Sequence, residues 1–452
     1  MYYIPLTKLY KIWFNKNPEE WLDVENQLRF IHMVQKHPEA KISFLYSREL
    51  LSERATSDME EFCKKHGIQP VSIEIFKDKL RNETEKELFD TACTELRRWK
   101  DHTGGNPASA SDIFRILTPV MNDLGVYSDF DIKVDFSKLT SIMSGKCMAL
   151  PINLLPATKS ATISNELITF AVDNNGNLHA DVIKFMDIWQ NRVLSAYKDW
   201  VSALLVNEDP NSTLSIFVKK FLSSNKEQNR IDEIIDFRHF ILKNLDAKFL
   251  LCCDIPDLIE KRLHSFRERI GEEYIEAMLH LANLHNQFSD LDISSMTEDE
   301  IAITYGRFIV ELDPDLEQFN DYAKVSDAHV KLARLQIMKE TVILYSGPEV
   351  LSTILEKESS KSHQNPYDVF SAYHNNSLAL CIIAQPPLKI QNIRDLIDNG
   401  HTLLNNDLSW LEEGIIAKEK RVGKMDNDAR VIQRGFRSHV KRSQGDGQSH
   451  SK

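Results

Sequence analysis

Two aspartates near the end of an apolar run carry the strongest chemical signal in this chain. Asp129 and Asp131 stand two residues apart in a segment, residues 126–134, that the sequence predicts to be a strand. Side chains two apart in a strand leave the same face, so both carboxylates would point into one small volume. Such carboxylates raise each other's pKa unless a cation lies beside them.

A divalent cation is the expected partner of this acidic pair. A hard ion held by few protein oxygens keeps positions open for phosphate oxygens. There it can neutralise the charge on a departing diphosphate. The alternative is a solvated, acidic strand end with no ligand.

A second charged pair precedes the aspartates. Asp112 and Arg115 are spaced i, i+3 in a predicted helix that follows a Gly/Pro/Asn/Ser loop, residues 103–110. Ser109 or Ser111 is expected to cap this helix, which runs to about residue 123 and ends before Gly125. Arg115 either forms a salt bridge or, with Asp112, binds sugar hydroxyls.

The elements around these residues alternate between strand and helix. Strands are predicted at residues 9–14, 41–46, 70–76, 126–134 and 162–172, and helices at residues 19–35 and 49–66. This alternation indicates β-α-β units and a largely parallel sheet, whose carboxyl edge is where ligands of open α/β folds bind. The chain after residue 177 is mainly helical, with helices predicted at residues 179–205, 213–222, 229–245, 257–288, 327–345 and 348–357. Short apolar pieces at residues 378–383 and 403–411 interrupt this helical pattern.

The acidic block resembles a known family. ASDIFR at residues 110–115, a spacer, and LGVYSDFD at residues 124–131 are similar to the ASDILR and GGxYxDxD block of the large clostridial glucosylating toxins and related bacterial effector glycosyltransferases. The resemblance implies a Rossmann-like GT-A fold and a metal-dependent, retaining transfer from a UDP-sugar. It implies that Asp112 and Arg115 contact the donor sugar, that Asp129 meets ribose and sugar, and that Asp131 binds Mn²⁺ or Mg²⁺. Leu124 stands where the toxins usually have glycine.

Two flanking segments extend the resemblance. Trp13 falls where the family has a tryptophan that stacks on uracil, although a core position is equally compatible with the sequence. Residues 401–414 resemble the mobile loop whose serine helps with the metal and whose tryptophan covers the leaving phosphate. The matching residues are Ser409 and Trp410, but they are adjacent rather than separated by one residue, so Asp407 or Asn405 is an alternative metal contact. Tyr127 of the block and Asn165 complete the expected donor-binding residues.

A basic helix lies near the C-terminus of an otherwise acidic chain. Residues 429–442 hold five Arg or Lys residues and no acid, with an apolar stripe at helical spacing. The spacing resembles an IQ motif and implies calmodulin or a calmodulin-like protein as partner. A helix packed back on the domain, or a basic arm touching RNA or lipid, is the alternative. The motif residues are Ile432, Gln433, Phe436, Arg437, Val440 and Arg442.

Composition limits the function classes. The chain has 452 residues, of which 42% are hydrophobic, and its net charge of −12 gives no global attraction to nucleic acid or anionic lipid. No apolar run is long enough to span a membrane, and the N-terminal residues lack the pattern of a signal peptide.

The leading hypothesis is a metal-dependent retaining glycosyltransferase. It would move glucose or N-acetylglucosamine from a UDP-sugar to a hydroxyl of a host protein, as a secreted bacterial effector that acts in the host cytosol and is bound by calmodulin. The alternatives are a calmodulin-binding adaptor with a non-catalytic transferase fold and another metal-dependent phosphoryl-transfer enzyme. The expected parts are a nucleotide-sugar-binding core (residues 1–175), a helical acceptor-recognition part (176–400), an active-site loop (401–414), the basic helix (415–443) and a disordered tail (444–452).

Overall fold

The computed structural model describes most of the first 354 residues and one later strand. The described residues are 1–132, 134, 136, 139–155, 160–201, 210, 213–224, 231–251, 291–312, 314–348, 350, 351, 354 and 379–383. The part of the chain that is described has no helix long and apolar enough to cross a membrane.

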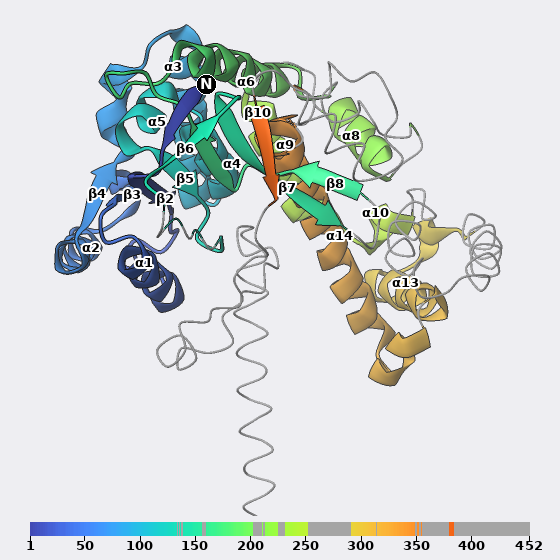
Figure 1. Ribbon diagram of the computed structural model, residues 1–452. Helices are drawn as coiled ribbons and strands as arrows, with labels where there is room; N and C mark the ends of the chain where they lie inside the picture. Colours follow the sequence, from blue (N-terminus) through green and yellow to red (C-terminus); the bar gives the residue numbers. More distant parts are fainter. Residues whose placement is uncertain are drawn as a thin grey trace, which may run out of the picture. The chain divides into compact units, whose positions relative to one another are not determined.

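An eight-stranded sheet forms the centre of the fold (Figure 1). Its strands are β2 (Lys8–Ile12), β3 (Lys41–Tyr46), β4 (Ile68–Ser72), β5 (Val126–Ser128), β7 (Met148–Leu155), β8 (Ser160–Ile163), β9 (Leu167–Phe170) and β10 (Ala379–Ile383). The order is β10-β7-β9-β5-β2-β3-β4, with β8 paired to β7 outside this path. The pairs among β5, β2, β3 and β4 are parallel, whereas β9 is antiparallel to both neighbours. A separate antiparallel pair joins β1 (Tyr2–Pro5) to β6 (Ser141–Ser144).

Local sequence signals set the ends of the first helices. Helix α1 (Val24–Lys36) begins after Asp23, whose carboxylate accepts a hydrogen bond from the Asn26 amide. Helix α2 (Glu53–His66) begins after Ser52 and ends at Gly67, which has a left-handed φ of 69°. The β3 strand has the predicted bounds, and β2, α1 and α2 lie within or close to theirs.

Three predicted elements near the acidic block have different bounds. The helix predicted from residue 110 to residue 123 is two helices, α4 (Pro107–Phe114) and α5 (Thr118–Leu124), because Pro119 cannot continue a helix begun before it. Asn106, rather than Ser109 or Ser111, caps α4. The strand predicted at residues 126–134 stops at Ser128, and the segment predicted at residues 162–172 is divided between β8 and β9.

Another strand prediction ends early. Residues 70–76 were expected to be extended, but β4 stops at Ser72 and a 3₁₀ helix, Ile73–Lys79, follows. Its Ile73 and Phe76 are buried, so the apolar residues that suggested a strand pack into the core from a tighter helical turn.

A large helical part follows β9. Its helices include α6 (Ala180–Lys198), α8 (Thr213–Ser224), α9 (Ile231–Asn244), α10 (Ala247–Leu251), α13 (Glu298–Leu312) and α14 (Tyr322–Tyr345). Both α6 and α9 contact α3 (Glu83–Lys100), and α14 contacts α4, α6 and α9. The expected fold class, a Rossmann-like α/β core with a large helical part, is confirmed.

The sheet itself continues past the helical part. Strand β10 lies within the segment assigned to the helical part, yet it pairs in parallel with β7, from Ala379 opposite Met148 to Ile383 opposite Ile152. The chain therefore returns to the sheet after these helices. The domain boundaries drawn at residues 175 and 400 stay predictions.

A buried ion pair joins the helical part to the core. Glu95 on α3 and Arg238 on α9 are both fully buried, and the Arg238 guanidinium donates to both Glu95 oxygens at 2.6 and 2.7 Å. The same carboxylate accepts from the Tyr197 hydroxyl at 2.8 Å and from the main-chain amide of Asn106 at 2.8 Å. Because Asn106 caps α4, Glu95 links two helices of the helical part to the helix that carries Asp112.

Two glycines allow this link to form. Gly104 and Gly105 have φ values of 105° and 78°, which side chains rarely adopt. A Cβ on Gly105 would lie 2.2 Å from the Glu95 carbonyl oxygen, and one on Gly104 would lie 2.5 Å from the Ile235 carbonyl oxygen. The loop can therefore pass between α3 and α9 only without side chains at these two positions.

We predict that Glu95→Gln lowers the free energy of unfolding by about 3–5 kcal/mol, because the Arg238 charge is left buried without an ionised partner. Urea unfolding of the full chain measures this loss. The matched control is Lys86→Met, which removes an exposed ion pair with Glu83 and should change stability by less than about 0.5 kcal/mol. Equal effects of the two substitutions would contradict the assignment of Glu95 as the buried partner of Arg238.

Candidate functional site

Neighbouring strands bring Trp13 and Asp129 to the same edge of the sheet. Strands β2 and β5 are parallel, with Tyr10 opposite Tyr127. Trp13 and Asp129 follow the carboxyl ends of these strands, at the edge where ligands of parallel sheets bind. A turn after β5 is held by hydrogen bonds from the Asp129 amide to the Glu166 carbonyl, 2.8 Å, and from the Ile132 amide to the Asp129 carbonyl, 3.2 Å.

This turn replaces the extended segment that the sequence predicted around the aspartates. Phe130, between them, is buried and packs edge-on against Phe30 and Trp13, with ring centroids 5.3 and 5.7 Å apart. The acidic pair is thus anchored by the apolar residue that separates its two members.

Arg115 lies between two carboxylates from different elements. Its guanidinium forms a salt bridge with Asp112, one turn earlier in α4, and a second with Asp129 at 3.1 Å between Nη1 and Oδ1. Asp112 and Arg115 are each 5% exposed, so water screens the pair between them poorly. The salt-bridge interpretation of this i, i+3 pair holds, and the pair reaches the acidic turn as well.

Tyr127 completes the contacts around Arg115. The guanidinium lies over the Tyr127 ring, 4.9 Å from its centroid, and the Tyr127 hydroxyl donates a hydrogen bond to Asp129. Burial, followed by the nearby Asp129 charge, raises the pKa of Tyr127 well above its usual value. Tyr127 therefore stays protonated and acts as a donor that orients the Asp129 carboxylate.

Asp112 is fixed by residues from two distant parts of the chain. Its Oδ1 accepts from the Asn165 amide at 3.1 Å, and its Oδ2 accepts from the Ser346 hydroxyl at 2.9 Å. Asn165 lies between β8 and β9, and Ser346 is the C-cap of α14. The helical part of the chain thus reaches the site directly through the end of α14.

Asp131 is held in an environment that opposes its ionisation. Burial, with the Asp129 charge as second cause, raises the pKa of Asp131 to about 6, while the cations of Lys11 and Arg29 act in the opposite direction. Lys11 is 2% exposed and donates to the Asp129 carbonyl at 2.5 Å and to the Ser128 hydroxyl at 3.1 Å. Burial lowers the pKa of Lys11 to about 7.

The donor set at the acidic turn fits a hard divalent ion that takes few protein ligands. Asp129 and Asp131 supply carboxylate oxygens, which Mn²⁺ and Mg²⁺ prefer. The described residues contain no group of three or more His, Cys, Asp or Glu side chains that could hold a metal. A metal here would therefore need further oxygens from a bound diphosphate or from residues outside the described ranges.

The indole Nε1 of Trp13 and the Nε of Arg115 are buried donors that lack a hydrogen-bond partner within the described residues. A buried donor without an acceptor costs about 1–3 kcal/mol, so a ligand that accepts from these groups would recover that energy. The arrangement can thus bind a polar ligand that presents several oxygens.

The structure brings together those predicted site residues that lie within the described part of the chain. Asp112, Arg115, Tyr127, Asp129 and Asn165 form one connected polar cluster. Asp131 and Trp13 flank this cluster through Phe130. The remaining predicted residues lie outside the described residues: Asp407, Ser409, Trp410, Ile432, Gln433, Phe436, Arg437, Val440 and Arg442.

Sequence reasoning missed Lys11, Arg29 and Ser346. Lys11 had a usable signal, because it is a lone cation within the apolar strand at residues 9–14. A charge in such a strand is seldom buried without a partner. Arg29 is one of many polar residues in α1, and Ser346 lies 234 residues from Asp112, so neither had a local signal.

We predict that Asp131→Asn stabilises the metal-free protein at pH 8. The pKa of Asp131 is raised on folding from 3.8 to about 6, so its ionisation weakens the folded state as the pH rises through this range. Asparagine avoids this effect and should add about 1–3 kcal/mol at pH 8 and little below pH 4. Urea unfolding at both pH values measures the difference.

The same experiment with Mn²⁺ tests the metal site. Mn²⁺ should stabilise the wild type and not Asp131→Asn, and its affinity for the wild type should fall below about pH 6 as protons compete for the carboxylate. Asp90→Asn, at an exposed position of α3, is the control and should behave as wild type. A loss of stability at pH 8 in Asp131→Asn would contradict the burial of its charge.

Comparisons with known proteins find similarity to glycosyltransferases. The family model described as glycosyltransferase family 88 matches residues 2–411. Among solved structures, one titled "PaToxG Glycosyltransferase" is 15% identical, over 67% of this chain and 85% of that chain, with a TM-score of 0.31. Another, titled "Structure of Transferase", is 12% identical, over 42% of this chain and 79% of that chain, with a TM-score of 0.28. The comparison with curated proteins gives no match.

The family match extends far beyond the acidic block. It begins in β1, takes in the polar cluster around Arg115 and the helical part, and ends after β10. Since it spans most of the chain, the chain belongs to glycosyltransferase family 88.

Proposed function

We propose that the protein is a metal-dependent, retaining glycosyltransferase that uses a UDP-sugar. The observation that carries this proposal is the position of Arg115, which holds Asp112 and Asp129 together at the carboxyl edge of the parallel strands, beside Asp131. Membership of a glycosyltransferase family supports transfer of a sugar, and the acidic turn supports a diphosphate donor.

The polar cluster is suited to hold the donor sugar. Asp112 can accept from sugar hydroxyls, and the free Nε of Arg115 can donate to them. Asn165 and Ser346 keep the Asp112 carboxylate in one orientation, and Tyr127 does the same for Asp129. Positioning of this kind lowers the barrier because the reacting atoms are already aligned.

Trp13 is suited to bind the base. It is half-buried at the end of β2, and its indole N–H lacks an acceptor among the described residues. We assign its ring to stacking on uracil. Asp129 is assigned to the ribose and sugar.

The metal site is assigned to Asp131 and Asp129, with Asp407 as a further ligand from outside the described residues. Bound Mn²⁺ or Mg²⁺ would neutralise charge on the departing diphosphate. Lys11 fixes the main chain of the acidic turn through its bond to the Asp129 carbonyl. Ser409 and Trp410 are assigned to a loop that closes over the donor and excludes water.

The acceptor is proposed to be a hydroxyl of a host protein, and the transferred sugar glucose or N-acetylglucosamine. The contact between Ser346 and Asp112 supports a role for the helical part next to the donor sugar. We further propose that the protein is an effector acting in a host cytosol, and that residues 432–442 bind calmodulin. The support for calmodulin is the IQ-like spacing of the sequence alone.

We predict Mn²⁺-dependent hydrolysis of UDP-glucose or UDP-N-acetylglucosamine by the full chain. Asp129→Asn and Asp131→Asn should each lower the rate by at least about 100-fold, because each removes charge stabilisation of the leaving group. Release of UDP measures the rate, and Asp90→Asn is the control. Full turnover in either site variant, or no hydrolysis of either donor by the wild type, would refute the proposal.

Calorimetry separates an enzyme from a calmodulin-binding adaptor. The transferase requires Mn²⁺-dependent binding of UDP, whereas an adaptor needs no nucleotide. Incubation with labelled UDP-sugars and host lysate, with and without calmodulin, would then identify the acceptor by mass spectrometry.

A further inference from the structure

A cavity lies at the opposite edge of the sheet from the acidic turn. It has a volume of about 430 Å³ and is formed by the amino ends of β2 and β3, by β4, by the end of α5 and by the turn at residues 175–177. Trp13 and Asp129 follow the carboxyl ends of the strands, so this cavity is separate from the donor site. Its charged and amide-bearing residues are Lys8, Lys41, Gln69, Lys79, Asn122, Asp123, Asn175 and Asn177.

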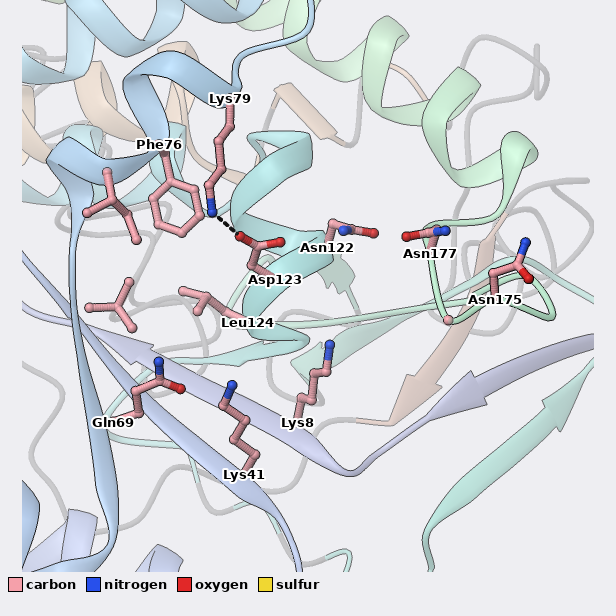
Figure 2. Close-up of a pocket in the computed structure, with 13 residues that line it drawn as sticks. Lys8, Lys41, Gln69, Phe76, Lys79, Asn122, Asp123, Leu124, Asn175 and Asn177 are labelled. Atoms are coloured by element: carbon pink, nitrogen blue, oxygen red, sulfur yellow. Dashed lines mark hydrogen bonds and ion pairs between the residues drawn. The ribbon is translucent and has the colours of Figure 1, made fainter.

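Two lysines lie side by side on one face of the sheet at this cavity. Lys8 and Lys41 are in register in the parallel pair of β2 and β3, so their side chains leave the same face of the sheet. Figure 2 shows both side chains extending from neighbouring strands toward the side where Asp123 and Asn122 lie. Like charges directly opposite each other destabilise a sheet. Both lysines are exposed, so water weakens this repulsion, and an anion between the two ammonium groups would replace it with attraction.

The described residues around the cavity do not supply that anion. The only carboxylate in the lining, Asp123, is already paired with Lys79 at 2.7 Å between Oδ2 and Nζ. Neither Lys8 nor Lys41 has an ion pair with any described residue. The lining thus holds two exposed positive charges that no carboxylate of the lining pairs with.

Amide groups add uncharged donors to the lysines. The Asn122 side-chain oxygen accepts from the Leu178 amide at 3.1 Å, which orients the Asn122 side chain and leaves its NH₂ group available. Asn177 is fixed because Asp173 accepts from its main-chain amide at 3.0 Å. Val71, Phe76 and Leu124 form a buried apolar floor. The volume is within the range of small-molecule sites.

We propose that this cavity binds a phosphate-bearing anion, as a phosphate monoester or diphosphate, either in solution or on a lipid headgroup. Neighbouring strands lie about 4.8 Å apart, so one phosphate group can accept from the Lys8 and Lys41 ammonium groups together. A phosphate dianion also matches the two uncompensated charges. The remaining oxygens can accept from the Asn122 amide.

The test uses inorganic pyrophosphate and the full chain. Calorimetric titration is carried out in EDTA, without nucleotide, so that metal-dependent binding at the acidic turn does not contribute. Saturable binding to the wild type is expected, and Lys8→Met/Lys41→Met should weaken it by at least about tenfold. Lys64→Met/Lys65→Met, at exposed positions near the end of α2, is the matched control and should bind as wild type. Higher salt should weaken the binding.

Thermal unfolding shows whether the double lysine variant loses binding because it is misfolded. Removal of two facing charges should leave the Tm of the unliganded double variant equal to or above that of the wild type. Pyrophosphate should raise the Tm of the wild type and of the control but not that of the double variant. UDP-sugar hydrolysis plays no part in either readout, so the proposal can fail without the transferase proposal failing.

Vesicles separate the two sources of phosphate. Sedimentation with phosphatidylcholine vesicles that contain phosphatidic acid, lost in Lys8→Met/Lys41→Met, would identify a lipid headgroup. Pyrophosphate binding without sedimentation would identify a soluble ligand. Absence of both, or equal binding by the wild type and the double lysine variant, would overturn the proposal.

Discussion

The guanidinium of Arg115 connects the elements on which the site depends. It pairs with Asp112 in its own helix and with Asp129 beyond the end of β5, and it lies over the Tyr127 ring. Arg115 and Asp112 are both almost fully buried, so each charge needs the other as its partner. One cation thus sets the relative position of α4 and the acidic turn, and every residue assigned to the donor sugar contacts this arrangement or flanks it.

The buried carboxylate of Glu95 likewise connects several elements, at a greater distance from the acidic turn. Glu95 joins α3 to Arg238 and Tyr197 of the helical part and to the amide of Asn106 at the start of α4. The helical part also reaches Asp112 through Ser346. The helices after β9 are therefore part of the framework of the site, even though they follow the first strands by a hundred residues or more. A change in their packing would reach Asp112 by two routes.

The acidic turn is less favourable for folding than its surroundings. Asp131 has its pKa raised to about 6 by burial, and Lys11 has its pKa lowered to about 7 by the same cause. A side chain whose pKa is shifted by burial lowers the stability of the fold. Such side chains are commonly found at binding and catalytic sites. On the opposite edge of the sheet, Lys8 and Lys41 place two like charges side by side. Charged side chains therefore gather at both ends of the strands, buried at the carboxyl end and exposed at the amino end.

The sequence by itself determined the class of fold and the residues of the acidic block. Apolar periodicity predicted β3 with its observed bounds and the helical part after residue 177, because burial of one face is a local property of the pattern. The spacing of Asp112, Arg115 and Asp129 pointed to three members of the polar cluster, and Asp131 to a residue beside it. Only the tertiary structure decided that Pro119 divides the predicted helix, that β10 returns to the sheet, and that Lys11, Ser346 and Glu95 hold the site. Those contacts join residues far apart in the chain, and no local pattern encodes which distant partner a buried polar group will find.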